Sequence, residues 1–466
     1  MSVLVIGAGI AGLTAAWHLV STGTPGSDIT VLESSPRVGG KLARAEVAGH
    51  LLDVGAESML ALRTEARELI DEVGLGDALT TPATTTAAIW SRGRLWPLPS
   101  GTLMGVPADP ESVRGLLTDA EVARLADEQP WPEPLAGDVA VGDYLAHRLG
   151  DAVVDRLVEP LLGGVYAARA RHLSMAAAVP MVYAVARDGG SVTSAAARAA
   201  AARSGTRSGS NAFIGLTGGV GRLPEHLRDV LLARGVRVET GQTVRALTRV
   251  GSGSRPQWEA TCGAVPAPAY RSADAVVLAV PPPAAGRLLT PLVPDAGEVL
   301  SRIEMASMAI VTLAVERRGA TLPGSGFLVP DIDGRTIKAS TFSSGKWAWV
   351  DALDDDVVFL RASIGRARDV AGLQRPDEDL VAVAVEEIGA AVGAPLPPVV
   401  DSHVQRWGGG LPQYAVGHLE RIARVEDAVA GVPGLEVCGA AYGGVGIPAV
   451  IASARAAADR LTRGRS

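Results

Sequence analysis

The chain of 466 residues contains little cysteine, little lysine and few aromatic residues. Its two cysteines, Cys262 and Cys438, are far apart and form no Cys-x-x-Cys pair, so neither a dithiol redox centre nor a zinc site is indicated. Only Lys41, Lys338 and Lys346 are lysines among 43 basic residues, a bias typical of coding composition. The seven histidines are scattered, without a His-x-x-x-His pair or a Ser-His-Asp arrangement. We therefore expect no metal site and no nucleophilic triad.

The charge balance and the hydropathy exclude further classes. A net charge of −7 gives no electrostatic reason to expect nucleic acid or an anionic membrane as a partner. With 47% hydrophobic and 20% charged residues, wholesale disorder is excluded. The chain is too long for one compact core, so we expect about two or three subdomains.

Membrane and secretion signals are also missing. The first apolar run lacks the basic region of a signal peptide. The longest uncharged window, residues 437–454, carries four glycines and Pro448, which favours a strand, a turn and a helix over a helix exposed to lipid. We expect a soluble, cytoplasmic protein without an integral membrane segment, and peripheral membrane contact stays open.

The strongest positive signal is a glycine turn at the N-terminus. Residues 3–6 predict a buried strand and residues 14–19 a helix, and between them stands Gly7-Ala8-Gly9-Ile10-Ala11-Gly12. In such a unit the backbone N–H groups and the helix N-terminus bind a pyrophosphate. Glu33 ends a second strand, residues 29–32, and its carboxylate would bind ribose and disfavour a 2′-phosphate. The turn therefore favours FAD or NAD over NADP; the alternative is a turn without a ligand.

Three further segments favour FAD over NAD. Arg37-Val38-Gly39-Gly40-Lys41 offers a second close backbone approach, with cations for a phosphate. In Asp53-Val54-Gly55-Ala56-Glu57-Ser58, Gly55 permits unusual backbone angles beside a ring system. The glycine-rich run 437–448 leads into a helix at Pro448, whose N-terminus would stabilise negative charge on a reduced flavin. The alternative for Arg37 to Lys41 is a turn with surface cations. For Glu57 and Ser58 it is the start of a helix, and for residues 437–448 it is a glycine-rich turn packed in the core.

The remaining pattern predicts the organisation of the chain. We expect a helix at 64–73, strands at 89–90 and 94–96, helices from 109 to 202, a mobile loop at 204–210, a hairpin of 237–240 with 243–247, and strands at 275–279, 309–313, 357–360 and 435–438. Because nucleotide-type signals occur at both ends and near the middle, one FAD domain interrupted by two insertions is indicated.

The predicted fold is therefore α/β, with a discontinuous Rossmann-like FAD-binding domain. It comprises residues 1–80, 208–285 and 430–466. A mixed α/β substrate-binding domain takes residues 81–108 and 286–429, and a helical domain takes residues 109–207.

With these segments in order, the chain resembles the porphyrinogen oxidases of haem biosynthesis, within the flavin-containing amine oxidase and phytoene desaturase superfamily. The more specific motifs are Gly55 to Ser58, Arg156 to Ala167, Gly326 to Pro330, Arg406-Trp407, Leu411-Pro412-Gln413-Tyr414 with Gly417-His418, and Tyr442 to Pro448. Together they extend the resemblance over essentially the whole chain.

The resemblance implies a set of cofactor residues. Pyrophosphate would lie at Gly7 to Gly12 and ribose at Glu33 beside Ser34, with Lys41 close to the cofactor. The other implied contacts are Gly55, Ala56, Glu57 and Ser58 near the flavin ring, Val244 at the adenine end, and Trp407, Val445, Gly446 and Ile447 at the flavin. No catalytic side chain is implied, because flavin N5 accepts the hydride. His418 is the histidine we single out, although a packed structural role is favoured for it.

The resemblance also implies a reaction. It is the six-electron oxidation of coproporphyrinogen III to coproporphyrin III, with FAD, with molecular oxygen as acceptor and with release of hydrogen peroxide. Protoporphyrinogen IX is the competing substrate, and a flavin amine oxidase or a non-redox escort protein of the same fold are the rivals. A partner enzyme of the haem pathway stays open.

The substrate pocket is implied at a few positions. Gly164, Val165 and Leu328 resemble pocket-lining residues, and Ser363 stands where relatives often carry a larger apolar side chain. Ala87 falls near a carboxylate-binding arginine of the mitochondrial enzymes, so Arg92 or Arg94 are hypotheses for that role, with ordinary surface arginines favoured.

Overall fold

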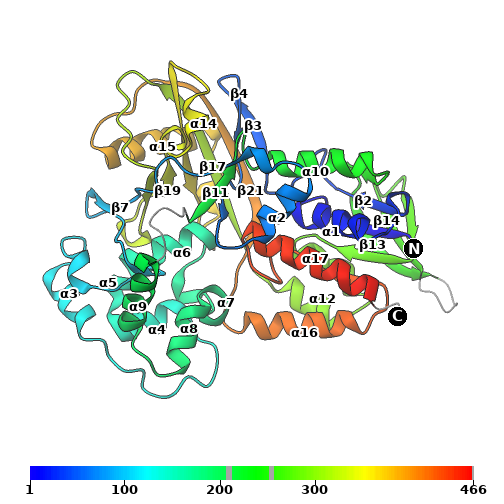
Figure 1. Cartoon of the computed structure of the whole chain (residues 1–466), viewed down its shortest axis with the longest axis horizontal. Helices are drawn as coiled ribbons and strands as arrows, with labels where there is room; N and C mark the ends of the chain where they lie inside the picture. The colour runs from blue at the N-terminus through cyan, green and yellow to red at the C-terminus, as the bar shows by residue number, and fades with distance from the viewer. Residues whose placement is uncertain (206–211, 251–256, 464–466) are drawn as a thin grey trace.

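A five-stranded parallel sheet forms the centre of one half of the protein (Figure 1). The computed structural model describes residues 1–205, 212–250 and 257–463. The sheet order is β12 (Arg237–Glu239), β2 (Ile29–Leu32), β1 (Val3–Ile6), β16 (Ala275–Leu278) and β22 (Leu435–Val437). Its strands come from the N-terminal, middle and C-terminal parts of the chain, as the nucleotide-type signals predict. The expected α/β fold is confirmed.

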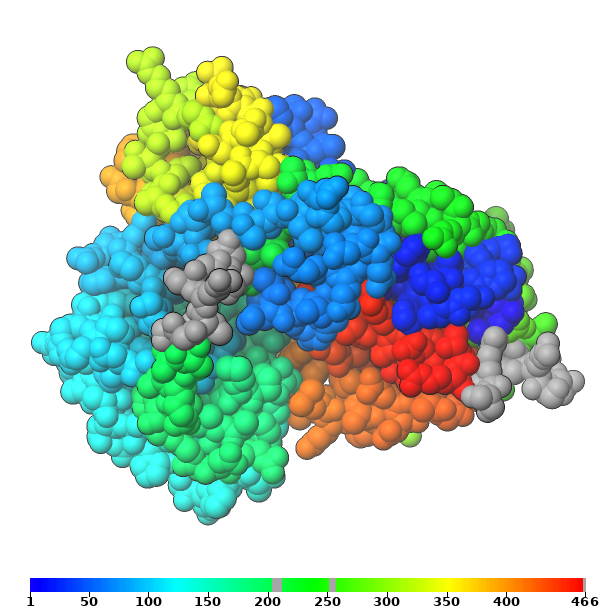
Figure 2. Space-filling view, viewed as in Figure 1, coloured from blue at the N-terminus to red at the C-terminus, as the bar shows by residue number. Residues whose placement is uncertain are grey.

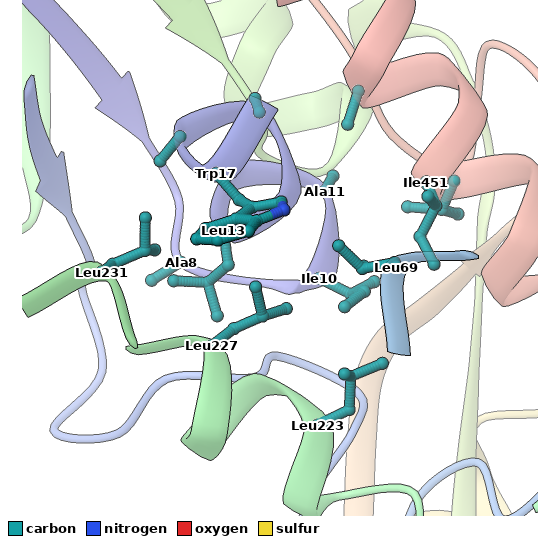
Figure 3. Packing of buried hydrophobic residues seen from close by; sticks show 14 of the residues in the cluster. Ala8, Ile10, Ala11, Leu13, Trp17, Leu69, Leu223, Leu227, Leu231 and Ile451 are labelled. Atoms are coloured by element: carbon teal, nitrogen blue, oxygen red, sulfur yellow. The ribbon is translucent and has the colours of Figure 1, made fainter. Parts of the chain in front are cut away.

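Helices cover both faces of this sheet, which explains why β1 is apolar throughout. Val3 and Val5 pack into the cluster that includes α1 (Ile10–Ser21), α2 (Glu65–Glu72), α10 (Arg222–Ala233) and α17 (Ile447–Arg463). Leu4 and Ile6 pack into the opposite cluster, with α11 (Pro282–Leu289), α12 (Pro294–Ser301) and α16 (His418–Ala430). Figure 3 shows the first cluster, in which Leu13 and Trp17 of α1 lie among side chains of neighbouring helices.

The predicted hairpin of residues 237–240 with 243–247 is wrong. β12 pairs in parallel with β2, whereas β13 (Val244–Val250) begins a separate antiparallel sheet with β14 (Gln257–Cys262) and β15 (Ala269–Ala273). The linking residues explain the difference, because Gly241 N donates to Ser35 O at 2.9 Å and Gln242 N donates to Glu33 O at 2.7 Å. The chain therefore crosses the end of β2 instead of folding back.

A seven-stranded sheet forms the second body. Its order is β21 (Val399–Pro412), β17 (Met305–Glu316), β20 (Val357–Ile364), β19 (Ile337–Thr341), β18 (Gly326–Leu328), β7 (Ala88–Ser91) and β8 (Arg94–Pro97). The predicted strands at 89–90, 94–96, 309–313 and 357–360 all lie in it. α15 (Asp377–Val392) packs against one face through a shared apolar cluster.

Helices dominate residues 109–202, as predicted, and the last helix continues to Gly205. They are α3 (Asp119–Ala126), α4 (Val141–Leu149), α5 (Asp151–Val153), a π-helical turn (Val154–Val158), α6 (Glu159–Tyr166), α7 (Met175–Ala178), α8 (Pro180–Arg187) and α9 (Val192–Gly205). This region, cyan to green, forms one end of the molecule in Figure 2. The predicted loop at 204–210 begins within α9, and its residues 206–210 lie outside the described part of the chain.

Short elements lie between and beside these bodies. They are β3 (Arg44–Val47), β4 (His50–Asp53), β5 (Met59–Leu60), β6 (Leu79–Thr80), β9 (Thr102–Leu103), β10 (Val106–Pro107), β11 (Phe213–Leu216), α13 (Ser343–Lys346) and α14 (Ala348–Asp351). Within the described ranges, no helix combines the length and the apolar character that crossing a membrane requires. The domain boundaries stay a prediction.

Candidate cofactor site

The three glycines of the N-terminal turn meet different surroundings. Gly7 has φ +104°, and a Cβ added there would lie 2.6 Å from Ala279 O. A Cβ on Gly12 would lie 1.8 Å from Gly7 O, whereas a Cβ on Gly9 would meet nothing within 4 Å. The packing of strand and helix thus requires glycine at Gly7 and Gly12. At Gly9 the structure leaves open space beside the backbone, which fits a pyrophosphate approaching this turn.

The N-terminus of α1 offers free donors at the same place. No side chain in the described ranges caps this helix at Gly9, and its first intrahelical bond runs from Leu13 N to Gly9 O at 3.0 Å. The amides of Ile10, Ala11 and Gly12 precede that bond and so have no intrahelical acceptor. Together with the helix dipole, they make the turn a site for an anion.

Glu33 lies directly beside this turn. Its Oε2 accepts a hydrogen bond from Ala8 N at 2.8 Å, and its Oε1 accepts from Ser35 N at 2.8 Å and from Ser34 Oγ at 3.3 Å. The segment before Val244 reaches the same strand end, through the bond from Gln242 N to Glu33 O. The structure therefore brings together the residues predicted for ribose and for the adenine end.

The second glycine segment packs onto the first. Gly39 N donates to Ala8 O at 2.8 Å, and Gly39 forms a β-bridge with Gly9. A Cβ on Gly40 would lie 3.4 Å from Gly9 Cα. The exposed side chain of Lys41 follows this contact. Two segments that were identified separately in the sequence thus form one backbone surface.

Gly55 and Trp407, both predicted near the flavin, are in contact. Trp407 Nε1 donates to Val54 O at 3.0 Å, and its Cζ2 would lie 3.3 Å from a Cβ on Gly55. Ala56 N donates to Lys41 O at 3.3 Å, which ties this segment to the second glycine turn. β21, which carries Trp407, thereby joins the seven-stranded sheet to the glycine-rich region.

Glu57 lies in an ion-pair network that sequence reasoning missed. Its Oε1 lies 2.6 Å from Lys346 Nζ, and its Oε2 lies 2.8 Å from Arg361 Nη1. Arg361 Nη2 also donates to Gly55 O at 2.6 Å. Burial acts to raise the pKa of Glu57, but the two cations outweigh it and lower this pKa to about 2. Because both carboxylate oxygens are engaged, Glu57 supports the site through the position of its segment, and Ser58 follows it toward β5.

The C-terminal glycine turn lies at the same edge of the parallel sheet. It connects β22 to α17, as the first turn connects β1 to α1, and carboxyl ends of parallel strands share one edge. Val450 N donates to Gly446 O at 3.0 Å, so the amides of Val445, Gly446 and Ile447 precede the intrahelical bonds of α17. The two ends of the chain thus present free amides on one side, and α1 and α17 pack side by side (Figure 1).

Three of the four predicted substrate residues come together where α6 meets the seven-stranded sheet. Leu328 and Ser363 both pair with Ala339, so they lie in one row across β18, β19 and β20. A Cβ on Gly164 of α6 would lie 3.6 Å from Leu328 Cδ2. Val165, the next residue, is 51% exposed. This row therefore faces α6 and the helical region.

The two arginines considered as carboxylate partners are engaged elsewhere. Arg92 Nη2 lies 2.8 Å from Glu121 Oε2, and the Arg94 guanidinium stacks 3.7 Å over the ring of Trp96. Ala87 O accepts a hydrogen bond from Leu98 N at 2.9 Å. These contacts agree with the favoured prediction that Arg92 and Arg94 are ordinary surface arginines.

The comparison with protein families decides the identification. A family model described as flavin containing amine oxidoreductase matches residues 10–462. The chain belongs to this family. It is an FAD-dependent oxidoreductase, and the two glycine turns at one edge of the parallel sheet fit that cofactor.

Curated relatives extend over nearly the full length. A coproporphyrinogen III oxidase of Mycobacterium leprae is 37% identical and covers 99% of this chain and 98% of its own. The enzyme of that name from Mycobacterium tuberculosis H37Rv is 35% identical and covers 97% of this chain and 95% of its own. The one from Bacillus subtilis is 30% identical and covers 99% of this chain and 98% of its own. A crystal structure described as "Putative protoporphyrinogen oxidase from Exiguobacterium sp. 255-15" has a TM-score of 0.84 and 30% identity, and covers 100% of this chain and 99% of that one. The expected family resemblance is confirmed.

Proposed function

We propose that this chain oxidises coproporphyrinogen III to coproporphyrin III in porphyrin biosynthesis. The observation that carries the proposal is the match to several bacterial coproporphyrinogen III oxidases over nearly the whole of both chains. The match spans the seven-stranded sheet and the helical region as well as the glycine turns. A fold match alone would support a flavoenzyme and no substrate.

The site geometry supports a set of cofactor contacts. The free amides of Ile10, Ala11 and Gly12 would bind the pyrophosphate, Glu33 would bind ribose, and the backbone near Val244 would bind the adenine end. Gly55 and Trp407 would hold the flavin ring, and the amides of Val445 to Ile447 would stabilise negative charge on the reduced flavin.

The chain's part in the reaction is to bind and orient FAD and the substrate and to exclude water from them. FAD supplies a two-electron oxidation with hydride acceptance at N5, and the conversion requires it three times per porphyrin. A macrocycle needs an apolar surface with cations for its carboxylates. Leu328 supplies the former, and Arg361 lies two residues from Ser363 on the same face of β20.

Protoporphyrinogen IX is the second candidate substrate. A chloroplastic/mitochondrial protoporphyrinogen oxidase 2 of Arabidopsis thaliana is 26% identical over 98% of this chain. That identity is lower than for the mycobacterial relatives, so coproporphyrinogen III is preferred here. An amine oxidase reaction has less support, because the relatives at 30–37% identity are named coproporphyrinogen III oxidases.

Initial rates on the two porphyrinogens test the proposal. Purified protein with FAD bound is mixed with each substrate under air, and porphyrin fluorescence and hydrogen peroxide are followed. We expect coproporphyrin III to form faster than protoporphyrin IX, with peroxide accumulating in step. A faster rate on protoporphyrinogen IX would favour the second candidate. Rates on both substrates equal to autoxidation without enzyme would refute the proposal.

Three further parts of the proposal await their own tests. Oxygen as the physiological acceptor is measured by the peroxide yield. A cytoplasmic location, and contact with a membrane surface or with another enzyme of the haem pathway, call for fractionation and co-purification.

A further inference from the structure

A short segment between β21 and α16 touches three separate parts of the molecule. Gln413 Nε2 donates to Tyr166 O at the end of α6 at 2.9 Å, and Tyr414 O accepts from Ser174 N at 2.7 Å. The side chains of Tyr414 and His418 both reach the glycine turn between β22 and α17. Tyr414 is 3% exposed and His418 is 1% exposed. The segment thus links α6, the helical region and the predicted flavin turn.

The Tyr414 hydroxyl forms a hydrogen bond with the backbone of this glycine turn. It donates to Ala440 O, on the side of the turn that leaves β22. On the other side of the turn, toward α17, stand the amides of Val445 and Gly446.

His418 fixes the neighbouring peptide. Its Nε2 lies 2.8 Å from Ala441 O, and a carbonyl only accepts, so Nε2 carries the proton. Its Nδ1 is buried without a hydrogen-bond partner in the described ranges. The ring stacks on Tyr414 with centroids 3.9 Å apart and an angle of 14°. Burial lowers the pKa of His418 to about 4, so the ring stays neutral near pH 7.

Tyr414 holds the carbonyl of Ala440, and His418 holds that of Ala441. Because a trans peptide is planar, these bonds also fix the N–H groups of Ala441 and Tyr442, and Tyr442 N donates to Gly439 O at 3.2 Å. If the carbonyls of Ala440 and Ala441 were released, they could rotate toward the cofactor. A carbonyl oxygen there would oppose negative charge on a reduced flavin.

We propose that Tyr414 and His418 are positioning residues that hold the turn Gly439 to Gly446 with its free amides aimed at FAD, and that they thereby favour the reduced cofactor. The proposal rests on the proposed function, which assigns this turn to the flavin. Neither side chain touches the reacting atoms; both act through the backbone.

The midpoint potential of bound FAD tests this role. Tyr414→Phe keeps the stacked ring and removes the hydroxyl, and His418→Leu removes the donor to Ala441 O. We expect each change to reduce the ratio of reduced to oxidised FAD affinity about tenfold, which is about 30 mV for a two-electron couple. His418→Gln keeps an N–H donor and should restore most of this loss.

Tyr442→Phe is the matched control. Tyr442 lies in the same turn, and its buried hydroxyl has no hydrogen-bond partner in the described ranges. Removing that hydroxyl should leave the potential unchanged. An equal shift in this control, or wild-type potentials in both Tyr414→Phe and His418→Leu, would overturn the positioning role. If Tyr414→Phe does not fold, the difference between His418→Leu and His418→Gln decides.

The two proposals fail in different ways. A wild-type protein that takes up FAD and oxidises neither porphyrinogen refutes the proposed substrate, while the potentials still report on the turn. A wild-type protein with full activity and potentials unchanged in the variants refutes the positioning role alone.

Discussion

At the scale of single residues, Gly9 is a position where binding of the cofactor requires glycine but folding does not. Its φ of −69° is open to any residue, and a Cβ added there would meet nothing within 4 Å. Aspartate is also a preferred residue at a helix N-cap. We therefore expect Gly9→Asp to fold and to purify without flavin, because the carboxylate opposes the pyrophosphate. Flavin absorbance and the unfolding temperature of the apoprotein measure both effects.

A matched glycine elsewhere controls for this change. Gly137 also meets no atom within 4 Å and is exposed, so Gly137→Asp should keep its FAD. Gly12→Ala, in contrast, places a Cβ 1.8 Å from Gly7 O and should destabilise the fold itself. Stoichiometric FAD in Gly9→Asp would contradict the assigned pyrophosphate site.

The buried side chain of Lys338 is predicted to lower the stability of the folded protein. Its side chain is 5% exposed, and no carboxylate in the described ranges pairs with it. Burial, with the nearby Arg366 charge, lowers the pKa of Lys338 to about 7 from 10.5. Between these values the unfolded chain binds more protons, so stability rises with pH. Lys338→Met should raise the unfolding temperature by about 2 °C or more near neutral pH.

The pH dependence distinguishes this explanation from better packing. The gain from Lys338→Met should shrink as pH approaches the pKa of the unfolded lysine, 10.5. Scanning calorimetry over this range measures it. A gain that is constant with pH would mean that burial of the charge is not its cause.

At the scale of elements, the Glu57 network joins the segment after β4 to β20 and α13. Glu57→Gln leaves Lys346 and Arg361 without their counter-charge, and we expect a loss of about 3–5 kcal/mol in unfolding free energy. Glu65→Gln is the control, because its pair with Arg63 is more exposed and worth about 0–1 kcal/mol. Urea unfolding of both variants supplies the comparison.

The ion pairs of Glu57 also predict how the stability of the protein changes in acid. The pKa of Glu57 is lowered to about 2 from 4.5, so its stabilisation is present above pH 4.5 and is lost as pH falls toward 2. Glu57→Gln should therefore flatten the decline of stability in that window. An unchanged acid slope would show that the ion pairs contribute little.

Elements also show how far the sequence could be interpreted. Periodicity predicted β1, β2, β16 and β22 of the parallel sheet and β7, β8, β17 and β20 of the seven-stranded sheet, where apolar runs are closed by turn residues. It did not predict β18, β19 or β21, and β21 is a long strand of mostly exposed or half-buried residues. Periodicity also misplaced residues 237–247, since the partner of β12 is a strand about two hundred residues earlier. The partners of Glu57 lie 289 and 304 residues away, so no local pattern could indicate them. The rarity of lysine was the one available signal for Lys346.

At the scale of the whole molecule, the chain builds the start and the end of one cofactor site from its two termini. The glycine turns after β1 and β22 were identified from local sequence, and their meeting at one sheet edge follows from the parallel topology. The residues between them form the seven-stranded sheet and the helical region. We propose that these inserted parts choose the substrate while the parallel sheet holds FAD.

Anaerobic mixing of the flavin-loaded protein with coproporphyrinogen III tests this account most directly. Without oxygen, the absorbance of oxidised FAD should fall on mixing, and oxygen added afterwards should restore it while porphyrin fluorescence rises. Gly9→Asp under the same conditions should show neither change. A wild-type protein whose bound FAD keeps its oxidised spectrum with both coproporphyrinogen III and protoporphyrinogen IX would contradict the account.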